Sequence, residues 1–244
     1  MHEPKRDAKD DLEFVWVPPG DFLYGENCER RSCDGFHLSR FQVTNRQFHE
    51  FMLDSGYSCS NESEGKLVAH WQGDAPPSDL KDHPVVFVSH IDALTYCQWA
   101  NLVLPTEWMW EKAARGTDGR TFPWGEQYAY WSMNGTWESP YKRENGGPLG
   151  RRCNVANEQT MPVGSFTEVR SAYGCEDMVG NVSEWCLSDP TQDTTAEVCL
   201  RGGCFRRVSR KSISLWYRRH LLPSRRNDWV GFRPAVCRDH TLTD

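Results

Sequence analysis

Apolar residues along the chain fall into short groups separated by long polar stretches. Phe14–Val17 is a run of β-forming residues that ends at a Pro-Pro-Gly sequence, and residues 22–24 are placed to form its hairpin partner. Residues 36–43 alternate between apolar and polar side chains, as a half-buried strand does. Residues 84–88 and 230–233 have the composition of two further strands. The pattern therefore predicts several short strands.

Three helices are predicted from their capping residues and from apolar side chains at i, i+3 and i+4. Thr44 can cap the first helix, and Gly56 can end it. Ser89 with Asp92 three residues later resembles a capping box, for a helix that reaches about residue 101. Thr106 can cap a third helix, whose last turn is basic and is followed by a glycine.

These elements indicate an α+β domain with about three helices, short twisted antiparallel strands and much ordered coil. The chain has no internal repeat, low-complexity tract or linker, so we expect a single domain over residues 14–237. A flexible N-terminus (1–13) and a tail (238–244) would flank it. The 11 tryptophans can hold so much coil together, because each buries a large rigid surface.

Charge is distributed unevenly along the chain. The 28 Lys+Arg and 34 Asp+Glu give a net charge of −6. Residues 200–233 nevertheless contain ten basic residues and one acidic residue, Asp228, so the remainder carries −15. Such a segment can bind nucleic acid, an acidic partner or carboxylates of its own protein. We favour the last, and we expect no nucleic-acid partner, because the chain contains no nucleic-acid-binding motif.

The sequence leaves the cellular compartment open. No run approaches 18 apolar residues, so a membrane-spanning helix is not expected. The polar N-terminus has no signal-peptide core: the protein would be cytoplasmic if this end is native, and exported or surface-attached if a leader was removed. The 10 cysteines fit either disulfides or buried thiols, and the absence of a C-x-x-C pair disfavours zinc.

A dozen short phrases occur in the order found in one known family. They lie at residues 17–25, 43–48, 83–89, 93–99, 104–107, 110–116, 122–125, 161–164, 177–181, 184–185, 201–203 and 230–233. Together they resemble the formylglycine-generating enzymes, or sulfatase-modifying factors, whose topology is C-type-lectin-like. The resemblance covers residues 14–237 and implies that fold. It does not by itself imply the enzymatic activity, because one fold carries many functions.

The resemblance implies where an oxidative centre would lie. The family's enzymes hold Cu(I) with a C-x4-C thiolate pair between a Gly-Gly turn and a final Gly-Phe-Arg, and the metal activates oxygen to oxidise a substrate cysteine. Here the two positions fall on Arg210 and Leu215, or the first falls on Ser212 when counted from the Gly-Gly turn. Residues 205–236 contain no cysteine, so we expect no copper there.

Two other metal-dependent readings are disfavoured. Cys199 and Cys204 have the x4 spacing, but they flank the Arg-Gly-Gly turn, and we expect them to be structural. The related iron-dependent sulfoxide synthases use a histidine triad from an added helical domain. The 8 histidines of this chain include no H-x3-H pair, and the chain has no room for that domain.

The C-terminal segment is also similar to that of the variable proteins of diversity-generating retroelements, which use this fold and diversify surface residues for ligand binding. The similarity implies a surface that binds a protein or another macromolecule. The candidate ligand-binding residues are Phe205, Arg206, Arg207, Ser209, Ser212, Ser214, Trp216, Arg219, His220, Asn227 and Trp229. In those systems the adenines of AAY codons are randomised, which gives NNY codons. Because NNY codons encode neither Trp nor Lys, Lys211, Trp216 and Trp229 would be fixed residues.

The alternative for the same segment is a structural one, in which its arginines pair with the acidic body and its aromatic residues fill the core. We expect this pairing for Arg201, Arg218 and Arg233. Thr106, Glu107 and Trp110, in another family phrase, are expected to cap and pack a helix rather than to catalyse a reaction.

A second site is implied by the phrase Asp177-x-x-Gly180-Asn-Val182-x-Glu184, which corresponds to a calcium loop in the family. There, two side-chain oxygens and two backbone carbonyls surround the ion, and such hard oxygen ligands suit Ca²⁺. The resemblance thus implies a structural Ca²⁺ held by Asp177, Gly180, Val182 and Glu184. The alternative is a Gly-Asn turn in which Glu184 is salt-bridged to an arginine.

Three functional hypotheses follow. The preferred one is a non-catalytic ligand-binding protein that displays its C-terminal segment, which a retroelement could diversify. The second is a metal-dependent oxidoreductase of the formylglycine-generating type. The third is a structural subunit that stabilises a partner protein.

Overall fold

The computed structural model describes residues 11–58, 66–71, 73–126, 130–131, 137–138, 153–155, 157–167, 169–188, 196–206 and 209–237. The helices are α1 (Asn45–Ser55), α2 (His90–Trp99) and α3 (Glu107–Arg115). None of the helices in this part of the chain combines the length and the apolar character that crossing a bilayer requires.

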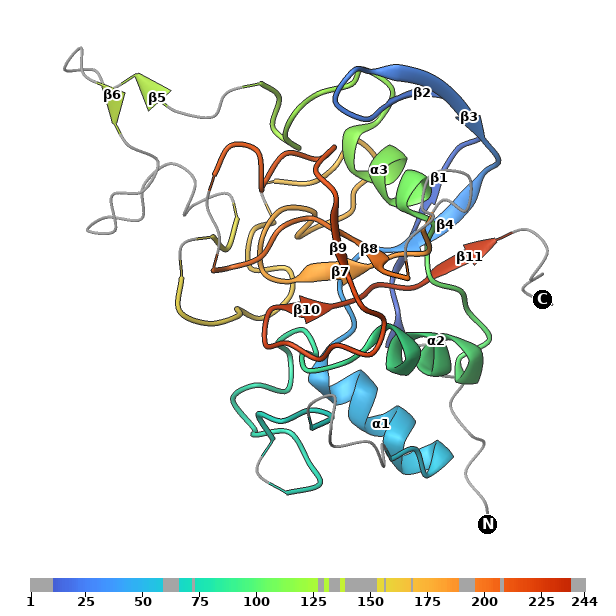
Figure 1. Cartoon of the computed structure of the whole chain (residues 1–244), viewed down its shortest axis with the longest axis vertical. Coiled ribbons are helices and arrows are strands. Elements are labelled where there is room, and N and C mark those ends of the chain that lie inside the picture. Colours follow the sequence, from blue (N-terminus) through green and yellow to red (C-terminus); the bar gives the residue numbers. More distant parts are fainter. Residues whose placement is uncertain are drawn as a thin grey trace.

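The strands are short. In chain order they are β1 (Phe14–Val17), β2 (Gly20–Tyr24), β3 (Glu29–Cys33), β4 (Phe36–Ser39), β5 (Tyr130–Trp131), β6 (Trp137–Glu138), β7 (Ser183–Trp185), β8 (Val198–Arg201), β9 (Arg219–Leu221), β10 (Val230–Gly231) and β11 (Ala235–Cys237). One sheet has the order β1-β4-β11 and joins the two ends of the chain (Figure 1). A second has the order β10-β7-β8-β9, in which only the β10–β7 pair is parallel.

The predicted caps are present at all three helices. Thr44 and Gln47 form a capping box at α1, and Ser89 and Asp92 form one at α2. The Thr106 side chain accepts a hydrogen bond from the backbone N–H of Met109 at α3. These hydrogen bonds satisfy backbone donors that a helix start otherwise leaves unpaired.

Two strand predictions were wrong. β1 pairs with β4, and the partner of β2 is β3, whose sequence Glu-Arg-Arg-Ser-Cys gives no apolar signal. Residues 84–88 form no strand, and Pro84 makes only an isolated bridge to Thr44. A short apolar run is ambiguous in sequence, and here tertiary packing rather than sheet pairing buries Val85 and Val88.

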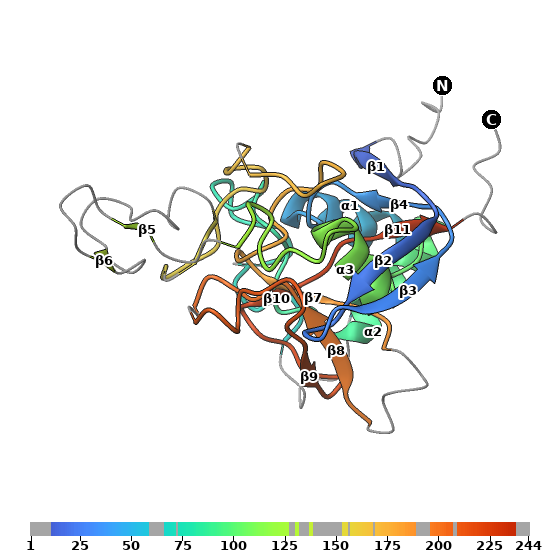
Figure 2. The ribbon, with the colours of Figure 1, turned by 90° about the horizontal axis from the view of Figure 1, so that it is seen from above.

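The core has two parts, and the second sheet lies between α3 on one side and α1 and α2 on the other (Figure 1). Figure 2 shows β1, β4 and β11 of the first sheet together, apart from β7, β8 and β9 of the second. One part is aromatic and joins α1 to α2 through Phe48, Phe51 and Tyr96. The other surrounds α3, where Trp110 is fully buried. Buried side chains of α2, α3 and β7 contact the C-terminal part of the chain: Asp92, Glu107 and Glu184 each pair with an arginine from that part.

Candidate recognition site

The candidate site is the segment 204–229, called the recognition segment below, which runs from the Gly202-Gly203 turn after β8 to the start of β10 (Figure 1). Both glycines have positive φ, of 89° and 69°. A Cβ atom on Gly203 would lie 2.6 Å from the backbone oxygen of Ser212, so only glycine lets the returning chain approach this closely. The turn therefore fixes where the segment begins.

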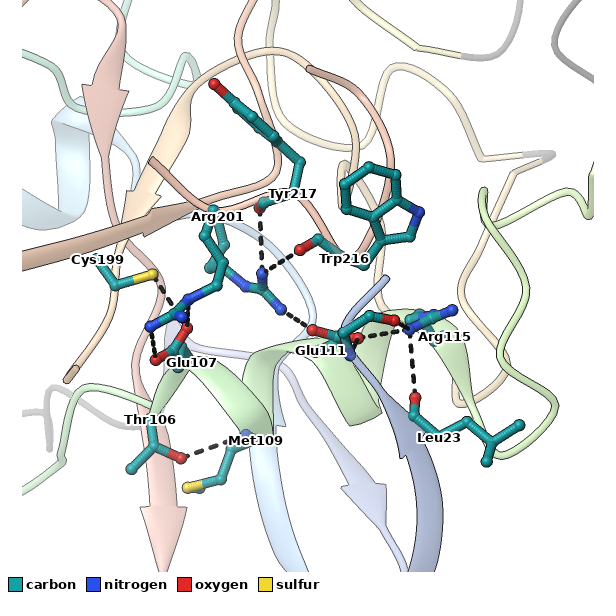
Figure 3. A network of polar contacts seen from close by, with 12 residues as sticks. Leu23, Thr106, Glu107, Met109, Glu111, Arg115, Cys199, Arg201, Trp216 and Tyr217 are labelled. Carbon is teal, nitrogen blue, oxygen red and sulfur yellow. Dashed lines mark hydrogen bonds and ion pairs between the residues drawn. The ribbon is translucent and has the colours of Figure 1, made fainter. Parts of the chain in front are cut away.

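Arg201 attaches this turn to α3. Its guanidinium is fully buried, pairs with Glu111 and donates to the backbone oxygens of Trp216 and Tyr217 at 2.9 and 3.1 Å (Figure 3). The other carboxylate oxygen of Glu111 accepts a hydrogen bond of 2.6 Å from Arg115. One buried glutamate on α3 thus pairs with two arginines, and through Arg201 it orients the backbone of the recognition segment.

Arg218 makes a second attachment, one helical turn earlier on α3. Its Nη2 atom donates to Glu107 Oε1 at 2.5 Å, and Glu107 is fully buried. The thiol of Cys199 lies 3.3 Å from Glu107 Oε2, and burial raises the pKa of Cys199 to about 12. Glu107 is therefore more than the packing residue expected from sequence, because it holds an arginine of the recognition segment.

Two further arginine–carboxylate pairs complete the attachment. Arg226 donates from Nε and Nη2 to the two carboxylate oxygens of Asp92 on α2, at 2.8 and 3.0 Å, and Tyr57 donates to the same carboxylate at 2.7 Å. Arg233, just beyond the segment, binds Glu184 of β7 at 2.7 and 2.8 Å. We call the four pairs of Arg201, Arg218, Arg226 and Arg233 the anchors.

The anchors confirm that arginines of the basic segment pair with the acidic body. The pairing was expected for three of the four arginines, and Arg226 was missed. Its partner Asp92 also accepts a 2.6 Å hydrogen bond from the backbone N–H of Ser89. The capping box therefore already accounts for an aspartate at position 92. A carboxylate that serves a cap and an ion pair at once gives no separate sequence signal.

The predicted ligand-binding residues divide by burial. Arg206 and Ser209 are exposed, whereas Ser212, Trp216, Arg219, His220, Asn227 and Trp229 are half-buried. Arg206 pairs with Asp228. The Arg219 guanidinium lies 4.2 Å from the centre of the Trp229 ring, a cation–π contact. Arg207 lies outside the described residues.

Phe205 and Ser214 were expected on the surface, but both are only 2% exposed. The backbone N–H of Phe205 donates to Asn181, which directs that part of the chain inward. The Ser214 hydroxyl donates to the backbone oxygen of Arg210 at 2.7 Å and so stabilises a local turn. In this conformation neither side chain can contact a ligand.

A hollow lies at the base of the segment, lined among others by Ser183, Gly203, Cys204, Ser212 and Tyr217. Its volume of about 10 Å³ is the space of a single water molecule. This hollow is therefore too small to hold a small-molecule ligand.

The positions that the family resemblance assigns to the copper ligands carry no thiol. Arg210 is exposed, Ser212 is half-buried, and Leu215 is buried in the core around α3. A guanidinium, a hydroxyl and an aliphatic side chain cannot supply thiolate ligands. Burial raises the pKa of the nearby Cys199, so its thiol keeps its proton at neutral pH unless a bound ion displaces it. That copper does not bind stays a prediction.

The implied calcium loop is occupied by the protein's own polar groups. The backbone oxygens of Asp177 and Val182 lie 3.4 and 3.3 Å from Nε2 of Gln42, which also donates to Glu184 at 2.9 Å. Arg233 takes both carboxylate oxygens of Glu184. The oxygen atoms do converge, but on an amide nitrogen and a guanidinium.

The Asp177 side chain and Gly180 also have partners within the protein: the Asp177 carboxylate accepts a hydrogen bond of 2.7 Å from the backbone N–H of Gly164. Asp177 has a positive φ of 55°, and burial raises the pKa of its carboxyl to about 6. A Cβ atom on Gly180 would lie 2.4 Å from the backbone oxygen of Asn154. Within the described ranges, no three His, Cys, Asp or Glu side chains are grouped to hold a metal ion. The arrangement is that of the Gly-Asn turn with an arginine-paired glutamate, and calcium binding stays a prediction that requires Gln42 or Arg233 to move.

Comparison with known sequences identifies relatives. Residues 1–238 match the family model described as a sulfatase-modifying factor enzyme 1-like domain. The chain is 39% identical over 229 residues to the formylglycine-generating enzyme of Mycobacterium tuberculosis, which covers 72% of this chain and 74% of that enzyme. It is 29% identical over 221 residues to the inactive C-alpha-formylglycine-generating enzyme 2 of Mus musculus, with coverages of 73% and 69%.

Two solved structures share the architecture. PvdO from Pseudomonas aeruginosa superposes with a TM-score of 0.71 at 22% identity, over 97% of this chain and 99% of that one. Variable protein 1 of Treponema denticola superposes with a TM-score of 0.62 at 17% identity, over 92% and 95%. At these identities the likeness concerns the fold alone, and it confirms the C-type-lectin-like α+β fold expected from the sequence.

Proposed function

Since this chain belongs to the family of sulfatase-modifying factor enzyme 1-like proteins, which includes the formylglycine-generating enzymes, we propose that it uses the family's fold to bind a macromolecular ligand rather than to oxidise one. The recognition segment would present the binding surface. The proposal concerns function only, because a shared fold does not fix what its surface does.

The observation that carries the proposal is the composition of the segment between the Gly-Gly turn and the final Gly-Phe-Arg. No cysteine occurs from residue 205 to residue 236, so this stretch offers no thiolate to Cu(I). A relative whose name calls it inactive supports the idea that the family's fold persists without the family's chemistry.

The anchors support a role in recognition because they make the segment a preorganised scaffold. Arg201 and Arg218 attach the middle of the segment to α3, and Arg226 attaches its C-terminal part to α2. Side chains that point outward, such as Arg206 and Ser209, can then vary without loss of the fold. A surface that is rigid before binding loses less conformational entropy when a ligand binds.

A retroelement-diversified version of this function is supported by the likeness to the Treponema variable protein. Arg206, Ser209, Ser212 and Asn227 are residue types that NNY codons can encode, whereas Trp229 would be fixed. The genomic locus tests it: we expect an adenine-rich near-copy of the 3′ end of the gene beside a reverse transcriptase. A locus with neither would remove the diversification and leave the binding function in place.

The binding function is tested against the enzymatic one by an activity assay. The reduced protein is incubated with Cu(I), oxygen and a cysteine-containing peptide, with the Mycobacterium tuberculosis enzyme as the positive control. We expect no aldehyde product from this chain. A double variant, Arg210→Cys with Leu215→Cys, reports whether restoring the thiols restores copper binding. Aldehyde formation by the unmodified chain would overturn the proposal.

A further inference from the structure

Two cysteines lie opposite each other where the pairing of β7 with β8 ends. The register of these antiparallel strands sets Trp185 opposite Leu200. One residue further, the backbone N–H of Cys186 donates to the oxygen of Cys199 at 3.1 Å, so these two are the next opposite residues. Both cysteines are thiols in this structure, and both are fully buried.

The two thiols lie on the same face of the sheet, the face toward α3. Alternate residues of a strand point to one face, and Glu184, two residues before Cys186, accepts a hydrogen bond of 2.7 Å from Trp110 of α3. Cys186 itself is buried in the core around α3. The thiol of Cys199 donates to Glu107 of α3 at 3.3 Å (Figure 3). The side chains of Cys186 and Cys199 are therefore neighbours across the strand pair.

This arrangement is close to the one that a disulfide requires. Cβ atoms of directly opposite residues in an antiparallel pair lie about 4.5–5.5 Å apart, and those of a disulfide about 3.5–4.5 Å apart. A small approach of β7 to β8 is therefore enough to join the two sulfur atoms.

Burial determines when such a bond can form. It raises the pKa of Cys199 to about 12, and it raises the pKa of Cys186 as well. Because the thiolate is the species that attacks a disulfide, two buried, protonated thiols exchange slowly in the folded protein. The bond would therefore form while the chain folds, and the folded protein would then shield it from reductants.

We propose that Cys186 and Cys199 form a structural disulfide when the chain folds under oxidising conditions. The two thiols together lose two protons and two electrons as the sulfur–sulfur bond forms. A small disulfide such as glutathione disulfide accepts both and leaves as two molecules of the reduced thiol. The bond closes a ring of 14 residues, 186–199.

The disulfide would lie beneath the recognition segment. β8 is hydrogen-bonded to β7 on one side and to β9 of that segment on the other, and Cys199 itself is opposite His220 of β9. Oxidation removes the S–H donor from Glu107, whose carboxylate keeps its ion pair with Arg218. The segment would thus rest on a covalently closed strand pair, whatever ligand it binds.

Oxidative refolding followed by peptide mapping tests the proposal. The denatured, reduced protein is refolded in a mixture of reduced and oxidised glutathione, alkylated, and digested with trypsin and an endoproteinase that cleaves after glutamate. The two enzymes separate the cysteines, because Cys186 falls in peptide 185–197 and Cys199 in peptide 198–201. We expect mass spectrometry to find these two peptides joined, and to find them separate after reduction.

Variants distinguish this bond from any other. The oxidised wild type should melt about 5 °C or more above the reduced protein, because the bond lowers the conformational entropy of the unfolded chain. Cys186→Ala and Cys199→Ala should each abolish the joined peptides and most of this difference. The matched control is Cys97→Ala, at a buried cysteine of α2, which should keep both.

A chain that does not refold from denaturant is examined instead after secretion into the oxidising bacterial periplasm, with the same digest. Alkylation of both cysteines in the wild type, or linkage of peptide 198–201 to any other cysteine, would overturn the inference. Neither result bears on what the recognition segment binds, so the proposed function is judged separately.

Discussion

Arg225 and Arg226 are neighbours in the sequence, but they belong to two different regions of the molecule. Arg226 points inward and is buried against Asp92 of α2, whereas Arg225 is exposed. The same division holds across the whole recognition segment, where Arg218 is anchored to Glu107 and Lys211 is exposed. Residue type alone therefore does not say whether a cation of this segment holds the fold or meets a partner.

The difference between the two regions follows from the cost of burying charge. A buried guanidinium is tolerated only with a paired carboxylate and further hydrogen bonds, and each anchor has such a partner. Removing one member leaves the other charged and unpaired in the interior. An exposed cation keeps its hydration, so its removal changes binding and not stability.

Glu111→Gln should have the largest effect, because the Glu111 carboxylate pairs with both Arg201 and Arg115. We expect the free energy of unfolding to fall by about 3–5 kcal/mol, the usual effect of breaking a buried ion pair. Equilibrium unfolding in guanidinium chloride measures this free energy, and Glu126→Gln, at an exposed glutamate, is the control. A loss below about 1 kcal/mol would mean that the anchor contributes little.

Arg226→Met and Arg225→Met form the sharpest matched pair. The first leaves Asp92 with hydrogen-bond donors but no cation, and we expect a loss of about 3 kcal/mol in the free energy of unfolding. The second should stay within about 0.5 kcal/mol of the wild type. Equal melting temperatures for the two variants would contradict the division of the segment into inner and outer arginines.

His90 gives the inner region a pH dependence. Burial lowers its pKa to about 4, below the ordinary value of 6.5, so the folded protein keeps the ring neutral while the unfolded chain binds a proton. Its contribution to stability is therefore present above pH 6.5 and is lost as the pH falls toward 4.

His90→Gln should remove this loss. Between pH 7 and pH 4.5, the free energy of unfolding of the wild type should fall by on the order of 2 kcal/mol more than that of the variant. Thermal unfolding followed across that range provides the measurement. Two curves that run parallel would show that the ring is not sheltered from protonation.

Gly203→Ala tests the Gly-Gly turn at the start of the recognition segment, and Gly56→Ala is its control. Both glycines have positive φ, of 69° and 67°, but only a Cβ atom on Gly203 would meet backbone, at 2.6 Å from Ser212. An alanine at positive φ lowers the free energy of unfolding by about 1 kcal/mol, and the clash with Ser212 should raise this loss at Gly203 to about 2–3 kcal/mol. Equal losses would show that the Gly-Gly turn can relax.

Local signals in the sequence were sufficient for the helices, but not for the strand pairing. Thr44, Ser89 and Thr106 act on donors within three residues, so their pattern is visible in a short window. The partner of β1 is β4, about 20 residues away, and the partner of β2 is a polar strand. Nothing local distinguishes these pairings from the simple hairpin.

The candidate site could be predicted in outline. The charge imbalance correctly indicated buried pairing, and the resemblance located the segment between fixed glycine-containing phrases. The direction of individual side chains was not accessible, which is why Phe205 and Ser214 were placed on the surface although they are buried. In coil without a repeating period, no pattern relates sequence position to the inner or outer face.

We propose that this scaffold binds a partner and holds no soft-metal oxidation centre. Competition of the fully reduced protein with a chromophoric Cu(I) chelator, followed by X-ray absorption at the copper edge, tests this claim most directly. We predict no Cu(I) retained against the chelator and no copper–sulfur scattering. One Cu(I) per chain with two sulfur neighbours would contradict the account.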